Sequence, residues 1–203
     1  MTDTIIIRRI TNPTDEEVDS MIAVCVAAYH GDQFTECAVG GDWNLHSAMR
    51  RTAIGAQQVG GENWVALHGD KIIAVAGWFP PGRALLDRKV SYLRVHDAFT
   101  YPSLLLGCSP EQAAAGWDAF VAKMPPALNQ WWTKEFLPEF SQLSTESLGP
   151  GVKKDSWHLQ TVATHPDYQR RGIATALLRH KEEMVASEGG AVIRSFINTE
   201  AGK

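Results

Sequence analysis

Apolar residues recur with a helical period between residues 173 and 187, and this is the clearest periodic pattern in the chain. The steps of three and four residues predict an amphipathic helix that ends at Gly189-Gly190. Its apolar positions are Ile173, Ala174, Leu177, Leu178, Met184 and Val185. Polar and charged residues fall on the opposite face, so we expect one side of this helix to pack against a core.

The amino-terminal part of the chain predicts one strand and two helices. Branched apolar residues favour a strand at Ile5–Ile10, and the run Pro13-Thr14-Asp15-Glu16 favours the start of a helix that reaches about Ala28. We expect a loop over residues 30–41, which includes Phe34. A second helix is expected over residues 42–58.

The remaining strands predict a mixed sheet. Residues 64–67 and 72–79 are apolar and flank the polar residues 68–71, a pattern typical of a β-hairpin. Further strands are expected at about 157–164 and 190–197, on either side of the helix at 173–187. A helical crossover joins parallel strands, so the predicted fold class is α/β (α+β), with a mixed, mainly antiparallel sheet flanked by helices.

A long segment between residues 81 and 155 interrupts this order of elements. It contains a helical pattern from Pro110 to about Ala122 and a break at Pro125-Pro126. A second piece follows with several aromatic and apolar residues, namely Trp131, Trp132, Phe136, Leu137 and Phe140. A structureless loop of this length is uncommon in a compact domain, so we expect one to three helices. The aromatic residues either pack the segment against the domain or form a lid over a pocket, and packing is the more common role.

Two arginines precede the helix at residue 173, where the unpaired backbone N–H groups already carry partial positive charge. Arg170 and Arg171 are therefore unfavourably placed unless an anion lies between them. Gly172 permits close approach of a ligand to the backbone, and the N–H groups of the first turn can bind that ligand. Together these features predict a phosphate-binding turn. A tight connection without a ligand is the alternative, but it does not explain the paired arginines.

The sequence QRRGIA at residues 169–174 resembles the Q/R-x-x-G-x-G/A signature of the GCN5-related N-acetyltransferases, the GNAT superfamily. The preceding strand, which ends in VATHP at residues 162–166, also resembles that family. The close resemblance covers about residues 155–201, and a looser one covers residues 3–80. In detail the chain is more similar to fungal small-molecule acetyltransferases than to histone-modifying members. The resemblance implies a single N-acetyltransferase domain over residues 1–203, with a helical insertion at about 81–155 between its third and fourth strands.

The resemblance also implies acetyl-coenzyme A as the cosubstrate, with no metal. Backbone N–H groups from Arg171 to Thr175, which include those of Gly172, Ile173 and Ala174, would bind its diphosphate, and Arg170 or Arg171 would add charge. A bulge near Val162, Ala163 and Thr164 would open the sheet. The backbone groups freed there would pair with the amides of the pantetheine arm and direct one N–H at the thioester oxygen.

His158 is the candidate for proton transfer, because acetylation needs a neutral amine. Regular alternation along the strand places His158, Gln160 and Val162 on one face, and Trp157, Leu159 and Thr161 on the other. Arylalkylamine acetyltransferases have histidines at the positions of His158 and Gln160, so only the first is present here. A catalytic His158 and a hydrogen-bonded structural His158 are both consistent with the sequence. His165, which precedes Pro166, is expected to face solvent.

The carboxyl-terminal residues resemble the family only in part. The run Asn198-Thr199-Glu200-Ala201 resembles an N-x-x-A motif whose asparagine contacts the coenzyme arm, so Asn198 is a further candidate binding residue. The family's thiolate-protonating tyrosine, final helix and sixth and seventh strands would follow Lys203. We therefore expect that the chain is a truncated form of such a protein, with residues 190–197 at an exposed sheet edge.

Composition narrows the function classes. The chain has 203 residues, with 19 Lys and Arg against 23 Asp and Glu. This charge balance does not favour binding to a nucleic-acid or membrane surface. The three cysteines, Cys25, Cys37 and Cys108, are widely spaced and lack the spacing of metal ligands. They are typical of reduced thiols, and we expect a cytoplasmic protein.

Two functions stay open from the sequence. The first is transfer of an acetyl group from acetyl-coenzyme A to a small-molecule amine, by direct attack in a ternary complex. The second is a non-catalytic module that binds coenzyme A without turnover. The sequence identifies neither the acceptor amine nor the oligomeric state.

Overall fold

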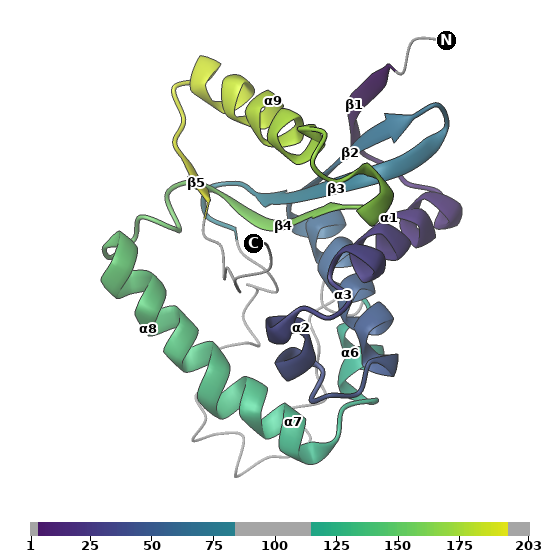
Figure 1. The fold of residues 1–203 in the computed structure, drawn as a ribbon. Helices are drawn as coiled ribbons and strands as arrows, with labels where there is room; N and C mark the ends of the chain where they lie inside the picture. Colours follow the sequence, from purple (N-terminus) through teal and green to yellow (C-terminus); the bar gives the residue numbers. More distant parts are fainter. Residues whose placement is uncertain (1–3, 84–114, 195–203) are drawn as a thin grey trace.

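The computed structural model describes residues 4–83 and 115–194, and a five-stranded sheet forms its centre (Figure 1). The strands lie in chain order and comprise β1 (Ile5–Ile10), β2 (Glu62–His68), β3 (Lys71–Phe79), β4 (Trp157–Thr164) and β5 (Val192–Arg194). Neighbouring strands are antiparallel except for the parallel pair β4 and β5. The mixed sheet and the β2–β3 hairpin predicted from the sequence are therefore confirmed.

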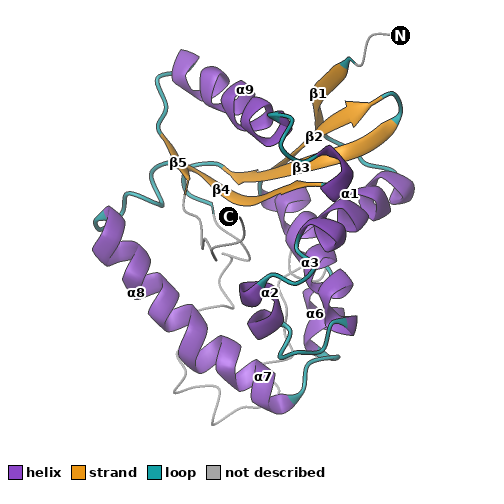
Figure 2. Cartoon of the chain, viewed as in Figure 1, coloured by secondary structure: helices purple, strands orange, loops and turns teal. Residues whose placement is uncertain are grey.

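Helices cover both faces of the sheet (Figure 2). Helix α9 (Ile173–Ser187) lies on one face, where Leu177 packs with Trp78 of β3. Helices α1 (Asp15–Ala28) and α3 (Asn44–Gly60) lie on the other face, where Met21 and Ile54 pack with Val75. Because both faces are covered, β3 is apolar from Ile72 to Phe79, and β2 is apolar over its central residues 64–67.

Local sequence explains where helix α1 begins. The Thr14 hydroxyl accepts from the backbone N–H of Glu17, and the Glu17 carboxylate accepts from the backbone N–H of Thr14. This capping box satisfies two of the free amides at the helix start, and the helix begins where the sequence predicted a helix start.

The expectation of a loop over residues 30–41 was wrong in part, because this segment contains the short helix α2 (Gln33–Ala38). The Asp32 carboxylate caps this helix by accepting from the backbone N–H of Thr35 at 2.7 Å. Six residues are too few for a visible helical period, so the cap was the only available signal. Thr35 and Ala38 are fully buried.

The described part of the insertion is mainly helical. It contains α6 (Trp117–Val121), then α7 (Pro126–Gln130), a π-helical segment (Trp131–Phe136) and α8 (Leu137–Leu148), which follow one another directly. The predicted break at Pro125-Pro126 is confirmed, since α7 starts there. Residues 84–114, including the first five residues of the expected helix at 110–122, lie outside the described residues.

Two of the insertion's aromatic residues pack against the domain. Trp132 donates from Nε1 to the Ala38 carbonyl at 2.8 Å, and Trp131 and Trp132 pack against a cluster that includes Val39 and Leu128. These contacts favour the packing role over a lid for the two tryptophans. The ring of Phe136 lies 5.3 Å from that of Phe34 in α2, which adds a second contact between the insertion and the domain.

The regular alternation expected along β4 was wrong, because a bulge interrupts the strand. Trp78 pairs with Leu159 and Gly77 pairs with Thr161, so Gln160 has no partner on β3. Because of this extra residue, the side chain of every later residue points to the face of the sheet opposite to the one expected. Leu159 and Val162 consequently face α9, whereas His158, Thr161 and Ala163 face the α1 and α3 side. Gln160 is exposed, so it does not lie beside His158 inside the protein.

A buried lysine joins α9 to the sheet. The Lys181 side chain is 3% exposed, and its Nζ lies 2.8 Å from the Glu62 carboxylate of β2. The same ammonium group lies 3.4 Å from the centre of the Trp157 ring on β4. A buried charge is tolerated only when it is paired, so this contact fixes the position of α9 over β2 and β4.

A polar cluster joins α2 and α3. The Arg50 guanidinium donates from Nε to His46 Nε2 at 2.9 Å and to the Thr35 hydroxyl at 2.7 Å. Burial first, and then the nearby charges of Arg50 and His30, lower the pKa of His46 from 6.5 to about 4. His46 is therefore neutral at pH 7, and its Nε2 serves as an acceptor for the arginine.

This lowered pKa predicts a pH dependence of stability. Between about pH 4 and pH 6.5 the unfolded chain binds a proton at His46 that the folded chain does not, so the free energy of unfolding rises with pH in this window. The substitution His46→Gln keeps an acceptor for Arg50 but cannot titrate. We expect its unfolding free energy, measured by urea denaturation at several pH values, to lose the slope of about one proton in that window. Equal slopes in the two proteins would contradict the assignment.

Candidate functional site

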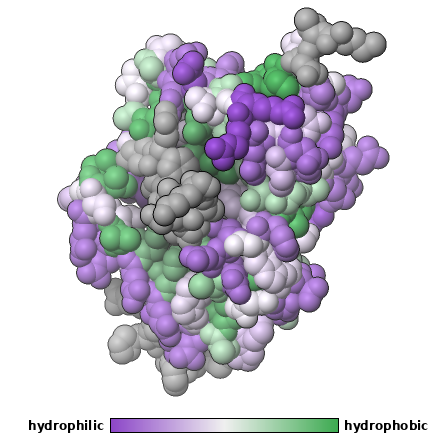
Figure 3. Space-filling view, in the orientation of Figure 1, coloured by the Kyte–Doolittle hydropathy of each residue, from purple (hydrophilic) through white to green (hydrophobic). Residues whose placement is uncertain are grey.

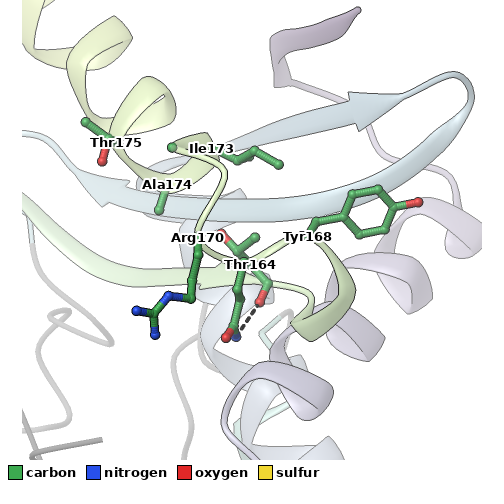
Figure 4. Close-up of a pocket in the computed structure, with 8 residues that line it drawn as sticks. Thr164, Tyr168, Arg170, Ile173, Ala174 and Thr175 are labelled. Atoms are coloured by element: carbon green, nitrogen blue, oxygen red, sulfur yellow. Dashed lines mark hydrogen bonds between the residues drawn. The ribbon is translucent and has the colours of Figure 1, made fainter. Parts of the chain in front are cut away.

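A surface cleft lies where β4 ends and α9 begins (Figure 4). Its volume is about 300 Å³. The residues that line it are Thr164, Tyr168, Gln169, Arg170, Gly172, Ile173, Ala174 and Thr175. The surface around the turn between β4 and α9 is strongly hydrophilic (Figure 3). A cleft at a helix start, within a hydrophilic surface, is a suitable place for an anionic ligand.

The backbone of this turn has an unusual conformation. Arg170 has a φ of 61°, the only positive φ of a non-glycine residue in the part of the chain that the structure describes. Gly172 has a φ of 77°, and a Cβ atom placed there would meet open space. Side chains other than glycine rarely adopt this conformation, and strained residues cluster at functional sites.

The start of α9 is uncapped. Gly172 occupies the cap position without a side chain, and none of the described side chains bonds to the first-turn N–H groups. The buried Thr164 hydroxyl, which also lines the cleft, has no hydrogen-bond partner among the described residues. These donors therefore face the cleft with no partner among the side chains that the structure describes, which is the condition for binding a phosphate group.

The two arginines of the turn have different positions. Arg171 donates from its guanidinium to the Asp167 carbonyl at 3.0 Å and lies 5.3 Å from the centre of the Tyr168 ring. It therefore stabilises the turn and does not line the cleft. Arg170 lines the cleft, and its guanidinium extends from the turn in Figure 4. Of the two predicted cationic groups, only Arg170 is placed to contact a ligand in the cleft.

Val162, Ala163 and Thr164 of β4, which the sequence predicted to bind the coenzyme arm, direct their backbone groups to different edges of the strand. The backbone N–H of His165 donates to the Ile73 carbonyl of β3. In an antiparallel strand, the backbone groups of alternate residues point to the same edge. Ala163 therefore pairs with β3, and it is buried beneath α1 and α3. Val162 and Thr164 direct their backbone groups to the other edge of β4. The described part of β5 pairs with β4 only as far as Leu159, so it does not cover these groups.

Sequence reasoning did not identify Tyr29, which contacts this edge. Its hydroxyl donates to the Val162 carbonyl at 2.5 Å, from the end of α1. The Arg50 guanidinium lies 4.0 Å from the centre of its ring. Burial raises the pKa of Tyr29 to about 12, so the hydroxyl keeps its proton at neutral pH. No pattern in the sequence joins residue 29 to residue 162, so this contact could not be predicted.

The structure places the candidate catalytic histidine away from the cleft. His158 is 1% exposed, and its ring stacks on Phe79 with centroids 5.5 Å apart. It lies four residues before Val162 on β4, a distance of roughly 13 Å along a strand. Asn198 lies outside the described residues. His165 is partly exposed, and its Nδ1 accepts from the backbone N–H of Asp167 at 3.3 Å.

The described part of the chain contains no metal-binding site. No group of three or more His, Cys, Asp or Glu side chains is arranged to hold a metal ion within residues 4–83 and 115–194. Cys25 is buried and Cys37 is exposed, and both are free thiols. None of the helices in those residues is long and apolar enough to cross a membrane.

Comparison with known proteins agrees with this geometry. Residues 128–201 match the Acetyltransferase (GNAT) family, a segment that includes the whole turn and helix α9. No curated protein sequence matches the chain.

Solved structures show the same fold at low sequence identity. A putative acetyltransferase from Pyrococcus horikoshii is 14% identical, with a TM-score of 0.50 and coverage of 98% of this chain and 84% of that chain. The mosquito arylalkylamine N-acetyltransferase like 5b is also 14% identical, with a TM-score of 0.50 and coverage of 95% and 76%. A GNAT family acetyltransferase from Brucella melitensis, solved in complex with acetyl-CoA, is 11% identical, with a TM-score of 0.47 and coverage of 98% and 79%. The Pyrococcus and mosquito structures show that the chain has the fold of GNAT acetyltransferases.

The positive φ of Arg170 leads to a prediction on stability. Arg170→Gly and Arg170→Ala both remove the cation, but only glycine adopts this backbone conformation without strain. We expect the glycine variant to have a free energy of unfolding about 1 kcal/mol higher than the alanine variant. Urea denaturation of the two variants measures this difference. Equal stabilities would show that the turn is not strained at residue 170.

Proposed function

We propose that the chain is an N-acetyltransferase that transfers an acetyl group from acetyl-coenzyme A to a small-molecule amine. The observation that carries the proposal is the uncapped start of α9 behind two residues of positive φ, Arg170 and Gly172. This arrangement leaves several amide donors open to the cleft. The family match over residues 128–201 and the GNAT fold support the same donor substrate.

The diphosphate of the coenzyme would lie at the start of α9. The N–H groups of Gly172, Ile173, Ala174 and Thr175 would donate to its oxygens, and the Arg170 guanidinium would balance its charge. Arg171 would contribute its backbone N–H, since its side chain is bonded within the turn. In this assignment the turn supplies most of the binding energy.

The pantetheine arm would extend from there along the edge of β4. Thr164 and Val162 offer backbone donors on that edge, and Val162 N–H would point at the thioester oxygen. Ala163 would support the arm indirectly, as the strand residue paired with β3. The role of Asn198 toward the same arm stays a proposal from sequence resemblance.

The reaction would proceed by direct attack of the amine. The amine nitrogen forms a bond to the acetyl carbon, the carbon–sulfur bond breaks, and the coenzyme leaves as a thiolate that then takes up a proton. The amine loses one proton on the way to the amide. Because His158 lies roughly 13 Å from Val162 along β4, it would accept this proton through a chain of several water molecules. Val162 N–H would stabilise the negative charge that develops on the acetyl oxygen.

The alternative function is binding of coenzyme A without turnover. The burial of His158 against Phe79 is the observation that favours it, because a buried histidine away from the cleft is also consistent with a packing role. A panel of small amines assayed with acetyl-coenzyme A, together with calorimetric titration of the coenzyme, separates the two functions. Turnover of any amine supports the enzyme, and binding without turnover supports the module.

The substitution Gly172→Asp tests the binding site. Aspartate places a carboxylate beside the proposed diphosphate and adds strain at a φ of 77°. We expect affinity for acetyl-coenzyme A to fall below detection in calorimetric titration.

The matched control for this change is Gly172→Asn, which has the same size and tolerates a positive φ but carries no charge. We expect it to retain measurable affinity. If the two variants bound the coenzyme as tightly as the unchanged protein, the site would have to lie elsewhere.

The substitution His158→Ala tests proton transfer. We expect kcat to fall at least tenfold, while affinity for acetyl-coenzyme A changes little, because His158 does not line the cleft. Phe79→Leu is the control, since it disturbs the same ring stack and keeps the imidazole. Equal losses of kcat in the two variants would assign His158 to packing.

A further inference from the structure

The Tyr29 hydroxyl reaches the open edge of β4 from the face of the sheet that α1 and α3 cover. Its oxygen lies 2.5 Å from the carbonyl oxygen of Val162. The N–H group of Val162 points to the same edge as this carbonyl, because both backbone groups of a residue in an antiparallel strand point the same way. The phenol oxygen of Tyr29 therefore lies close to the N–H group that would bind the thioester oxygen.

The hydrogen bond to Val162 decides which contacts the Tyr29 hydroxyl can still make. A hydroxyl has one hydrogen to donate and two lone pairs that accept. Burial raises the pKa of Tyr29 to about 12, so the group is neutral at pH 7 and its hydrogen is used on the Val162 carbonyl. None of the hydrogen bonds within the described residues ends on the Tyr29 oxygen. The oxygen can therefore accept from a bound molecule, and an N–H group is a suitable donor.

The ring of Tyr29 is held in this position by residues of α2 and α3. The Arg50 guanidinium lies 4.0 Å from the centre of the ring. Arg50 is itself bonded to His46 of α3 and to Thr35 of α2. The phenol oxygen consequently has a fixed place beside Val162 before any substrate binds.

The two substrates would reach the thioester from opposite faces of the sheet. The cleft for the coenzyme lies at the start of α9, which covers one face, whereas Tyr29 follows the end of α1, which covers the other (Figure 1). With the coenzyme on the α9 side, the open approach to the acetyl carbon is from the α1 side. An amine on that path meets the Tyr29 oxygen beside the bond that it attacks.

We propose that Tyr29 is a catalytic residue that binds the acceptor amine, with its oxygen accepting a hydrogen bond from the amine N–H. This contact directs the nitrogen lone pair at the acetyl carbon. The proposal rests on the function proposed above and adds a contact for the second substrate. As the nitrogen–carbon bond forms, the nitrogen gains positive charge and the N–H···O bond becomes stronger. Tyr29 keeps its own proton throughout, and the amine proton leaves through water to His158.

The test is steady-state kinetics of Tyr29→Phe, which keeps the ring beneath Arg50 and removes only the hydroxyl. The probes are 2-phenylethylamine, agmatine and spermidine, which are an aromatic, a guanidinium-bearing and a polycationic amine. For each amine that the unchanged protein acetylates, we expect kcat/KM to fall about tenfold or more. We expect the Kd of acetyl-coenzyme A in calorimetric titration to stay the same, since the hydroxyl contacts the amine and not the coenzyme.

The pH profile of kcat/KM separates this role from proton transfer. A hydroxyl that only accepts a hydrogen bond does not titrate below its pKa of about 12. The profile of Tyr29→Phe should therefore keep its midpoints at a lower rate. Loss of one limb of the profile would make Tyr29 an acid or a base and would overturn the proposed role.

A second variant separates the amine contact from a loss of packing. Thr52→Val also removes a buried hydroxyl, one that donates to the Ala48 carbonyl at 3.0 Å within α3. We expect this variant to match the unchanged protein in kcat/KM and in affinity for acetyl-coenzyme A. Thermal unfolding followed by circular dichroism shows whether both variants are folded. An equal loss of kcat/KM in Thr52→Val would assign the effect to packing and overturn the proposal.

Each remaining outcome has a distinct meaning. A loss of kcat/KM in Tyr29→Phe with full affinity for acetyl-coenzyme A supports the proposal. Unchanged kcat/KM, or an equal loss of coenzyme affinity, overturns it and leaves the proposed function intact. If the unchanged protein acetylates none of the amines, the proposed transferase function fails, and the role of Tyr29 fails with it.

Discussion

Helix α9 starts without a cap, so the free N–H groups of its first turn must find partners elsewhere. The first N–H groups of α9 find no partner in the described side chains, so they depend on water or on a ligand. The turn before them is held in a conformation that costs energy at Arg170 and is free of cost only at Gly172. Such a site keeps its shape only if the elements on both sides are fixed. The rest of the fold provides this support.

Three independent contacts supply that support. Lys181 ties α9 to β2 through Glu62 and to β4 through the Trp157 ring. Arg171 closes the turn on the Asp167 carbonyl, and Gln169 closes it on β4. The cleft is thus built from backbone groups whose positions are set by one buried side chain, Lys181, and by two side-chain bonds within the turn, which preorganises it for a ligand.

The sequence predicted the features that depend on neighbours along the chain. The helix at 173–187, the hairpin and the start of helix α1 follow from period, turn residues and acidic residues. The phosphate-binding turn, inferred from charge at a helix start, stays a prediction. Features that depend on contacts across the sheet were missed. Tyr29 contacts Val162, which is 133 positions away in the sequence. Arg171 bonds within the turn while Arg170 lines the cleft, and this difference depends on where the Asp167 carbonyl lies. Helix α2 was missed because it is too short to show a period.

The unpaired residue of β4 has a consequence for how this chain tolerates change. Gln160 is exposed and opposite no residue, so many side chains can replace it without loss of packing. Its removal from the chain is a different matter, because a deletion would rotate Trp157, His158 and Leu159 to the opposite faces of the sheet relative to everything that follows. Leu159 would leave the core under α9, and His158 would leave Phe79. At this point in the chain, relatives should preserve the number of residues more strictly than their chemistry.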